Sequence, residues 1–204
     1  MKPYKVLTIN PGSTSTKVAL FQGEECLYSQ TVSHEAKELE QYASMSEQLP
    51  YRRDTVLTLL KEAGIGLEEV DVFVGRGGGL IAMEGGTYGV TDLMLEHART
   101  CANGVIHPAA LGSQLAHEFA QAYGAKAMVV NPPDVDELQE LARMTGIRGV
   151  HRIIHLHALN LKETAIRHSK NVMRKPYGEC SYVVCHIGGG ISISAHEKGR
   201  MIDG

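Results

Sequence analysis

The stretch at residues 6–21, VLTINPGSTSTKVALF, constrains the fold more than any other part of the chain. Its apolar runs at 6–9 and 18–21 have the length of β-strands and flank a polar connector, which predicts a hairpin. The connector combines Gly12, which lets backbone N–H groups approach a ligand, with hydroxyl residues that end at Lys17. Such a tip suits an anion such as phosphate. The same residue types also form ordinary solvated turns, so both interpretations stand at this point.

Composition is that of a soluble globular protein. Hydrophobic residues make up 43% and charged residues 21% of the 204 residues, enough for one large domain or one domain plus part of another. The net charge of −3, without a basic run, argues against a nucleic-acid or membrane-surface partner. No stretch approaches the roughly 20 apolar residues that cross a bilayer. Because residues 1–5 lead into a strand and not into an apolar signal segment, we expect a cytoplasmic protein.

The cysteines do not form a recognisable pattern. Cys26 and Cys101 stand far from each other and from the pair Cys180 and Cys185, which lies in an apolar strand. This spacing fits neither a zinc site nor a disulfide framework. We therefore predict small buried thiols.

Periodicity along the rest of the chain predicts a layered α/β fold. Further strands are expected at 24–34, 71–74, 127–130, 181–186, 191–196 and 200–203. Helices are expected at 50–63, 93–101, 109–123, 136–144 and 157–168. Successive strands followed by alternating helices and strands indicate a sheet with helices on its faces. In such sheets ligands bind beyond the strand ends, where this sequence keeps its glycines.

Glycine-rich loops directly follow two of these strands. Arg76 lies in the loop at 75–79, whose tight backbone can fix its planar fork toward a carboxylate or phosphate; the alternative is a flexible turn with a solvated arginine. The triplet at 188–190 stands between two strands and lets backbone N–H groups face a second anion. Neither loop is a P-loop or a dinucleotide fingerprint. Together with the first hairpin, they make phosphate binding the most economical interpretation.

Several motifs in chain order resemble the acetate kinase family, and most closely its butyrate kinase branch. They are NPGSTSTK at 10–17, GRGG at 75–78, HALN at 157–160, HIGGGIS at 186–192 and KGR at 198–200. Acetate kinases carry an asparagine in the middle of the glycine triplet, which favours the butyrate kinase branch. The resemblance implies the actin-like (ribonuclease H-like) fold, with ATP between two domains. It also implies phosphoryl transfer from ATP to a short-chain carboxylate, butyrate or a branched-chain fatty acid, to give an acyl phosphate.

The resemblance also implies roles for single residues. The first phosphate region is matched by Asn10, Ser13, Ser15 and Lys17, and the second by Gly188, Gly189 and Gly190. Arg76 matches the arginine that engages the carboxylate or the transferring group. His107 and His157 match two histidines that stabilise the planar phosphoryl group. Since a carboxylate nucleophile is already ionised at neutral pH, this chemistry needs cations and donors and no general base.

Some of these residues also have structural interpretations. His107 precedes Pro108 and suits a hydrogen bond to a backbone carbonyl at a helix start. His157 forms a closely spaced group with His151 and His155 that suggests metal ligands, although no nearby cysteine or carboxylate completes a zinc set. For His157 we rank phosphoryl stabilisation first, a structural histidine second and a metal ligand third. Lys17 has a further interpretation as a solvated strand residue.

Two residues depart from the family pattern. Asn131 follows the strand at 127–130, where acetate kinases place an aspartate that helps to hold magnesium through water. Ala110, shortly after the pair His107 and Pro108, replaces an asparagine that is usual in the family. The resemblance thus implies ATP and Mg²⁺ as cofactors, but it leaves the metal ligands of this chain unknown.

The family continues beyond the end of this sequence. This predicts an N-terminal domain at 1–150 and, at 151–204, a linking helix and the first hairpin of a truncated second domain. The resemblance implies a homo-oligomer for the full-length form. Two other functions stay open: an acetate or propionate kinase, and a non-catalytic actin-like fragment that binds phosphate or a partner.

Overall fold

The computed structural model describes residues 3–204, which form two compact units. The first unit runs to Ile81 and also contains Thr87–Val130. The second contains Ala82–Gly86 and Asn131–Gly204. The compact units divide after Val130, whereas the sequence predicted a domain boundary after residue 150. That boundary concerns the domains of the whole protein and stays a prediction.

The first unit is built on a six-stranded sheet with the order β3-β2-β1-β4-β6-β5. Its strands are β1 (Lys5–Pro11), β2 (Ser15–Gln22), β3 (Glu25–Ser33), β4 (Val72–Gly75), β5 (Thr87–Gly89) and β6 (Lys126–Val130). The first three strands pair antiparallel in sequence, because only short turns separate them. β4 lies parallel to β1 and to β6, while β5 closes the edge antiparallel to β6.

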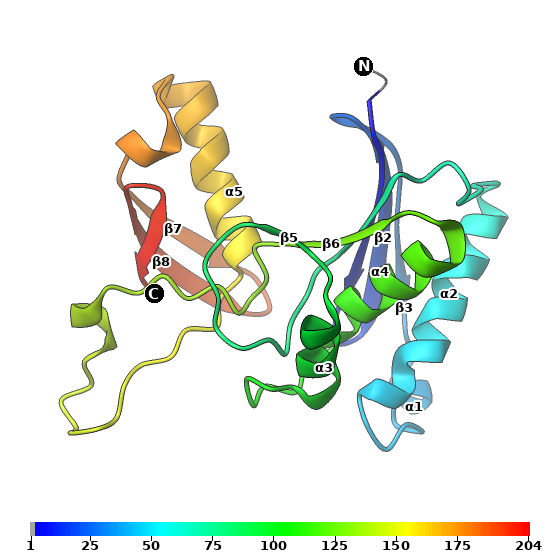
Figure 1. Ribbon diagram of the computed structural model, residues 1–204, viewed down its shortest axis with the longest axis horizontal. Coiled ribbons are helices and arrows are strands. Elements are labelled where there is room, and N and C mark those ends of the chain that lie inside the picture. The colour runs from blue at the N-terminus through cyan, green and yellow to red at the C-terminus, as the bar shows by residue number, and fades with distance from the viewer. Residues whose placement is uncertain (1–2) are drawn as a thin grey trace. The chain divides into compact units, whose positions relative to one another are not determined.

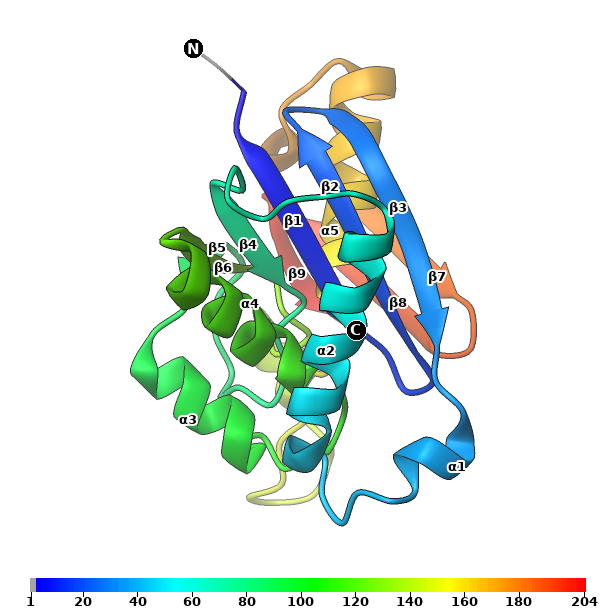
Figure 2. The same ribbon diagram turned by 90° about the vertical axis from the view of Figure 1, so that its right-hand side faces the viewer.

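Helices cover one face of this sheet. Figure 2 shows α2 (Leu49–Glu62) and α4 (Ala110–Tyr123) over the sheet, with α3 (Asp92–Thr100) beside α4. The single turn α1 (Ala36–Leu39) and a 3-10 turn (Ser46–Gln48) lead into α2. The core between the layers contains Leu7, Ile9, Val18, Val56, Leu60, Phe73, Leu111, Leu115 and Phe119. Each of these side chains contributes roughly 1.5–3 kcal/mol by leaving water, so the apolar spacing of the sequence determines the layers.

The second unit contains a three-stranded antiparallel sheet and one long helix. The strands are β7 (Tyr182–Ile187), β8 (Ile191–Glu197) and β9 (Arg200–Asp203), in that order. Figure 1 shows α5 (Ala158–His168) against this sheet. The helix continues as a π-helical turn (Ser169–Met173), and a 3-10 turn (Tyr177–Glu179) precedes β7. Their shared core contains Val135, Ala158, Leu161, Ala165, Val184 and Met201.

The predicted helix at 136–144 is wrong. Only a 3-10 turn, Glu140–Arg143, forms there. The Asp136 carboxylate accepts the Leu138 N–H at 3.1 Å and both Nη groups of Arg143 at 2.8 Å. Such local side-chain bonds offer the backbone an alternative to helical hydrogen bonds. The Gln139 N–H donates to Ile202 O at 3.0 Å, which ties this segment to β9.

The prediction of buried cysteines holds only in part. Cys180 is buried, while Cys101 is half-buried. Cys26 and Cys185 are exposed, because each lies at an outward-facing position of its strand, β3 or β7. Cys185 is thus exposed although it belongs to an apolar strand.

A buried polar network lies under the sheet of the second unit. Lys162 Nζ donates to both carboxylate oxygens of Glu137, at 2.9 and 2.7 Å. His196 is 2% exposed and lies 2.6 Å from Tyr177 Oη through Nδ1 and 2.6 Å from Ser194 Oγ through Nε2. Burial, and then the nearby charge of Lys162, lowers the pKa of His196 to about 4.

The depressed pKa of His196 predicts a pH-dependent stability. Between pH 6.5 and about 4 the unfolded chain binds a proton on this ring that the folded chain does not, so acid favours unfolding. Over that interval the free energy of unfolding should fall by on the order of 3 kcal/mol, and below about pH 4 this contribution should stay constant. Urea unfolding of the wild type and of His196→Gln at several pH values measures the difference. Parallel pH profiles for the two proteins would contradict the assignment.

Candidate functional site

The β1–β2 hairpin brings the first group of predicted site residues together. Asn10 and Lys17 are directly opposite in the antiparallel register, so both exposed side chains extend from the same face. The Gly12 N–H donates to Ser15 O at 2.7 Å and closes the turn. At the tip, Ser13 is exposed and Ser15 is half-buried. Hydroxyl groups, an amide and one ammonium group thus share this end of the sheet.

Two backbone donors at this tip have no acceptor within residues 3–204. They are the N–H groups of Ser13 and Thr14. Both residues are exposed. Backbone donors left without a protein acceptor at a glycine-containing turn can bind an anion.

Arg76 lies next to the same end of β1. Its backbone N–H donates to Ile9 O at 3.0 Å, so the residue after β4 is fixed beside the residue that precedes Asn10. The side chain is half-buried, and burial lowers the pKa of its guanidinium. In the described part of the chain, this guanidinium makes no hydrogen bond or ion pair. A fixed, partly desolvated guanidinium differs from the solvated turn arginine of the alternative interpretation.

Glycines let the Arg76 loop pack directly on α4. A Cβ at Gly75 would lie 2.0 Å from Gly112 O, and a Cβ at Gly112 would lie 2.8 Å from the Arg76 backbone nitrogen. Gly78 has φ +153°, and a Cβ there would lie 2.8 Å from the Ala109 Cβ. The loop after β4 and the first turn of α4 therefore touch through their backbones.

His107 lies at this start of α4. The Ala109 N–H donates to His107 Nδ1, and the Ala110 N–H donates to His107 O, both at 3.0 Å. The sequence predicted a bond from the ring to a backbone carbonyl at the helix start, whereas the ring accepts a backbone N–H there. Because Nδ1 accepts, a neutral ring carries its proton on Nε2. Ala110 is buried, and its Cβ lies against Gly79: a Cβ added at Gly79 would be 3.2 Å from it.

The second unit brings His157 to the glycine triplet. His157 is the residue before the first turn of α5, and its ring points to β8, with Nδ1 2.9 Å from Ser192 Oγ. It stacks on His186 at 3.9 Å between ring centroids, with an interplanar angle of 13°. A Cβ on Gly190 would lie 3.1 Å from His157 Cε1. The HALN and HIGGGIS motifs therefore form one site, although the stacked pair of imidazoles was not predicted.

The triplet itself forms the exposed turn between β7 and β8. The Gly188 N–H donates to Gly190 O at 3.1 Å, and Gly189 has open space around it. The middle of the turn is therefore open, while the His157 ring lies against Gly190.

The metal interpretation of the histidine group gains no support. His155 Nδ1 lies 3.8 Å from a carboxylate oxygen of Asp134. Over residues 3–204, no three histidine, cysteine, aspartate or glutamate side chains are arranged to hold a metal ion.

Asn131 has a structural role that the sequence did not reveal. It adopts φ +41°, in the left-handed region that asparagine tolerates better than most residues. Its Oδ1 accepts the Gly86 N–H at 2.8 Å, and its own N–H donates to Gly86 O at 2.9 Å. Asn131 thus joins the segment Ala82–Gly86 to the rest of the second unit.

The buried arginine Arg52 was missed as a functional candidate. It occupies the stripe of α2 that also contains Val56, Leu59 and Leu60, all buried. An arginine at an apolar-stripe position is a signal that the sequence carries, because a buried guanidinium needs several acceptors. Its guanidinium donates to carbonyl groups of the β1–β2 hairpin.

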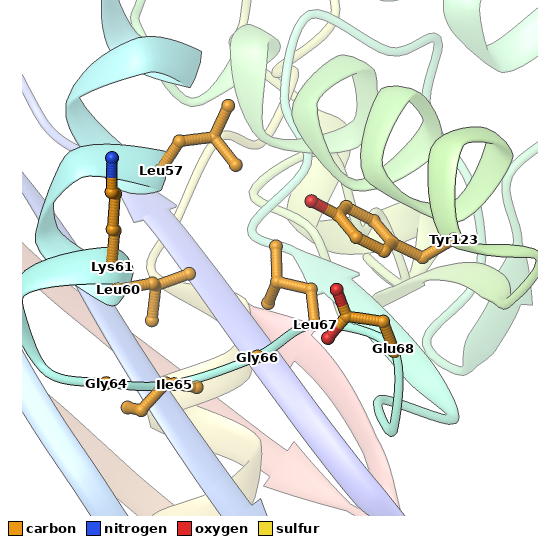
Figure 3. Close-up of a pocket in the computed structure, with 9 residues that line it drawn as sticks. All are labelled: Leu57, Leu60, Lys61, Gly64, Ile65, Gly66, Leu67, Glu68 and Tyr123. Atoms are coloured by element: carbon orange, nitrogen blue, oxygen red, sulfur yellow. The ribbon is translucent and has the colours of Figure 1, made fainter.

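A cavity of about 410 Å³ lies at the C-terminal end of α2 (Figure 3). Figure 3 shows the side chains of Leu57, Leu60, Leu67 and Tyr123 on its walls, with Lys61 and Glu68 also lining it. None of the site residues predicted from the sequence lines this cavity. The candidate site is therefore elsewhere.

Comparison with known proteins shows similarity to butyrate kinases. The chain is 42% identical over 200 residues to Butyrate kinase 2 of Clostridium acetobutylicum, a match that covers 98% of this chain and 56% of that protein. It is 40% identical over 202 residues to a probable butyrate kinase of Elusimicrobium minutum, with 98% and 54% covered. The resemblance to butyrate kinases is confirmed. The chain spans just over half the length of these relatives, and no family model matches it.

Solved structures confirm the predicted fold class. The acetate kinase of Porphyromonas gingivalis has a TM-score of 0.65 at 17% identity, with 98% of this chain and 56% of that chain covered. The acetate kinase of Entamoeba histolytica has a TM-score of 0.61 at 19% identity, with 98% and 54% covered. A propionate kinase of Francisella tularensis has a TM-score of 0.61 at 16% identity, with 98% and 56% covered. The chain has the layered α/β, actin-like fold of acetate kinases. Within residues 3–204, no helix has the length and apolar character to cross a bilayer.

Proposed function

We propose that the complete protein carrying this chain transfers the γ-phosphoryl group of ATP to a short-chain carboxylate, butyrate or a branched-chain fatty acid, to give an acyl phosphate. The observation that carries this proposal is Arg76, a half-buried guanidinium with a fixed backbone and no partner within the described residues. Such a group fits a ligand that brings its own negative charge. The identity to butyrate kinases supports the choice of substrate.

In this proposal a carboxylate oxygen attacks the γ-phosphorus, and the bond from that phosphorus to the ADP oxygen breaks. The attacking oxygen is already ionised, so no side chain has to remove a proton. Arg76 reduces the repulsion between the carboxylate and the phosphoryl group, and His107 and His157 donate to the planar group. The hairpin residues Asn10, Ser13, Ser15 and Lys17 and the triplet Gly188, Gly189 and Gly190 bind the phosphates.

The residues present fit ATP better than they fit a protein-bound metal. The free N–H groups of Ser13 and Thr14 suit a phosphate. Asn131 is neutral, and its amide oxygen is engaged by Gly86. We therefore propose Mg²⁺ as an ion held largely by the ATP phosphates and water, as is usual for this ion. A cytoplasmic location and a homo-oligomer complete the proposal; light scattering tests the latter.

Hydroxylamine trapping tests the proposed function. The complete protein is incubated with ATP, Mg²⁺ and butyrate, isobutyrate, propionate or acetate, and the acyl hydroxamate is measured. We expect the largest yield with butyrate or isobutyrate. A clear preference for acetate or propionate would favour an acetate or propionate kinase. ATP binding without hydroxamate from any acid would favour the non-catalytic alternative and contradict the kinase proposal.

Asn131→Asp should raise magnesium-dependent turnover by several-fold. The aspartate keeps an oxygen for the Gly86 N–H and adds the negative charge that acetate kinases have at this position. The measurement is kcat against Mg²⁺ concentration. Asn131→Ala serves as the control, because it loses the Gly86 bond without adding charge. Unchanged turnover in Asn131→Asp would exclude this position from the metal site.

A further inference from the structure

Arg52 reaches from α2 to the underside of the β1–β2 hairpin. Its side chain is fully buried. Nη1 donates to Gly12 O at 2.9 Å, to Ser15 O at 3.2 Å and to Thr16 Oγ1 at 3.1 Å. Nη2 donates to Ser13 O at 3.4 Å. One guanidinium thus binds three carbonyl groups of the tip at once.

The charge of Arg52 is not neutralised by a carboxylate in the described part of the chain. Its remaining hydrogen bonds, from Nε at 3.2 Å and Nη2 at 3.1 Å, go to the neutral Gln48 Oε1. Burial lowers the pKa of Arg52, yet a guanidinium stays charged near neutral pH. Burying a cation without a counter-ion is costly, so a positive charge retained behind an anion-binding turn indicates a use.

His34 also donates a hydrogen bond to a carbonyl group of the hairpin tip. The His34 N–H donates to Thr14 O at 2.8 Å, and its Nε2 lies 2.8 Å from Thr16 Oγ1. The carbonyls of Gly12, Ser13 and Thr14 are therefore all drawn toward buried donors.

Carbonyl direction determines N–H direction in this turn. In a trans peptide the C=O of one residue and the N–H of the next point in opposite directions. Because Gly12 O and Ser13 O face Arg52, the N–H groups of Ser13 and Thr14 point away from it. These are the two donors without an acceptor.

We propose that Arg52 is a positioning residue for phosphate binding: by holding the Gly12 and Ser13 carbonyls inward, it aims the N–H groups of Ser13 and Thr14 at a phosphate of the nucleotide. Its unneutralised charge lies behind these donors and attracts the same anion. The inference rests on the proposed function only for the identity of the anion as part of ATP.

Substitutions at Arg52 test the proposal in the complete protein. Arg52→Gln removes the charge, and Arg52→Lys keeps it but cannot bridge several carbonyls. The matched control is Arg53→Gln, because the neighbouring Arg53 pairs with Asp54 and with Glu118 of α4 and makes no bond to the hairpin within residues 3–204. Titration calorimetry gives the Kd for ATP, kinetics give kcat and both KM values, and circular dichroism gives the folded fraction.

We expect the Kd and KM for ATP to rise at least about tenfold in Arg52→Gln and to rise also in Arg52→Lys. The KM for butyrate should stay unchanged, as should all constants of Arg53→Gln. A merely structural arginine would lower kcat with the folded fraction and leave the KM for ATP unchanged. That result, or wild-type ATP affinity in Arg52→Lys, would overturn the proposal.

A second measurement uses the unmodified protein and can therefore be made even if the Arg52 variants do not fold. ¹⁵N-labelled serine and threonine report the amide signals of Ser13 and Thr14 in the unmodified protein during titration with ATP. Movement of both signals supports the proposal, and their constancy at saturating ATP overturns it. If they move while no acyl hydroxamate forms, the proposed function fails and phosphate binding by these two N–H groups stands.

Discussion

Arg76→Gln should lower kcat for acyl phosphate formation by on the order of 10³-fold, the lower end of what a transition-state arginine contributes in phosphoryl transfer. The guanidinium is half-buried and fixed by its backbone bond to Ile9, and no protein group within residues 3–204 neutralises it. Glutamine keeps much of the shape but brings no charge to the carboxylate and phosphoryl groups. Rapid-quench measurement of acyl phosphate gives kcat.

Two further variants test whether the effect is specific to the guanidinium of Arg76. Arg76→Lys should also lose most of the activity, because an ammonium group cannot make two parallel hydrogen bonds. Arg99→Gln, at an exposed arginine of α3 in the same unit, should behave like the wild type. A kcat for Arg76→Gln within tenfold of the wild type would remove Arg76 from the reaction.

Gly75→Ala should destabilise the first unit by at least about 3 kcal/mol. The added Cβ would lie 2.0 Å from the oxygen and 2.3 Å from the carbon of the Gly112 carbonyl, which are backbone atoms of α4. Strand β4 and α4 must therefore separate, and Arg76 must move with the strand end. Urea unfolding followed by circular dichroism measures the loss.

Gly89→Ala is the matched control for this substitution. Gly89 ends β5 in the same sheet, and a Cβ there would have no atom within 4 Å. Its unfolding midpoint should stay near that of the wild type. Equal midpoints for Gly75→Ala and Gly89→Ala would contradict the close packing of β4 on α4.

Strong local patterns explain which elements could be predicted. The antiparallel strands β1 to β3 and the helix α4 follow from apolar spacing and from turns of glycine and polar residues. The strand β5 (Thr87–Gly89) is too short for a pattern and exists because β6 offers it a partner. The helix expected at 136–144 failed because the Asp136 carboxylate binds Leu138 N–H and Arg143.

The candidate site was predictable where a motif is continuous in the chain. The resemblance identified Arg76 and His157, but the packing of the Arg76 loop on α4 and the stacking of His157 on His186 depend on tertiary contacts. Arg52 is distant in sequence from the hairpin that it supports, so no local pattern linked the two. That both glycine-containing turns bind the phosphates of a single ATP stays a prediction.

The fate of oxygen from the carboxylate tests the central claim most directly. The complete protein is incubated with ATP, Mg²⁺ and ¹⁸O-labelled butyrate, and the products are followed by ³¹P NMR. Transfer to the carboxylate predicts an acyl phosphate signal that carries the isotope shift of one ¹⁸O bonded to phosphorus. Release of ADP with unlabelled inorganic phosphate, and no acyl phosphate, would contradict the proposed phosphoryl transfer.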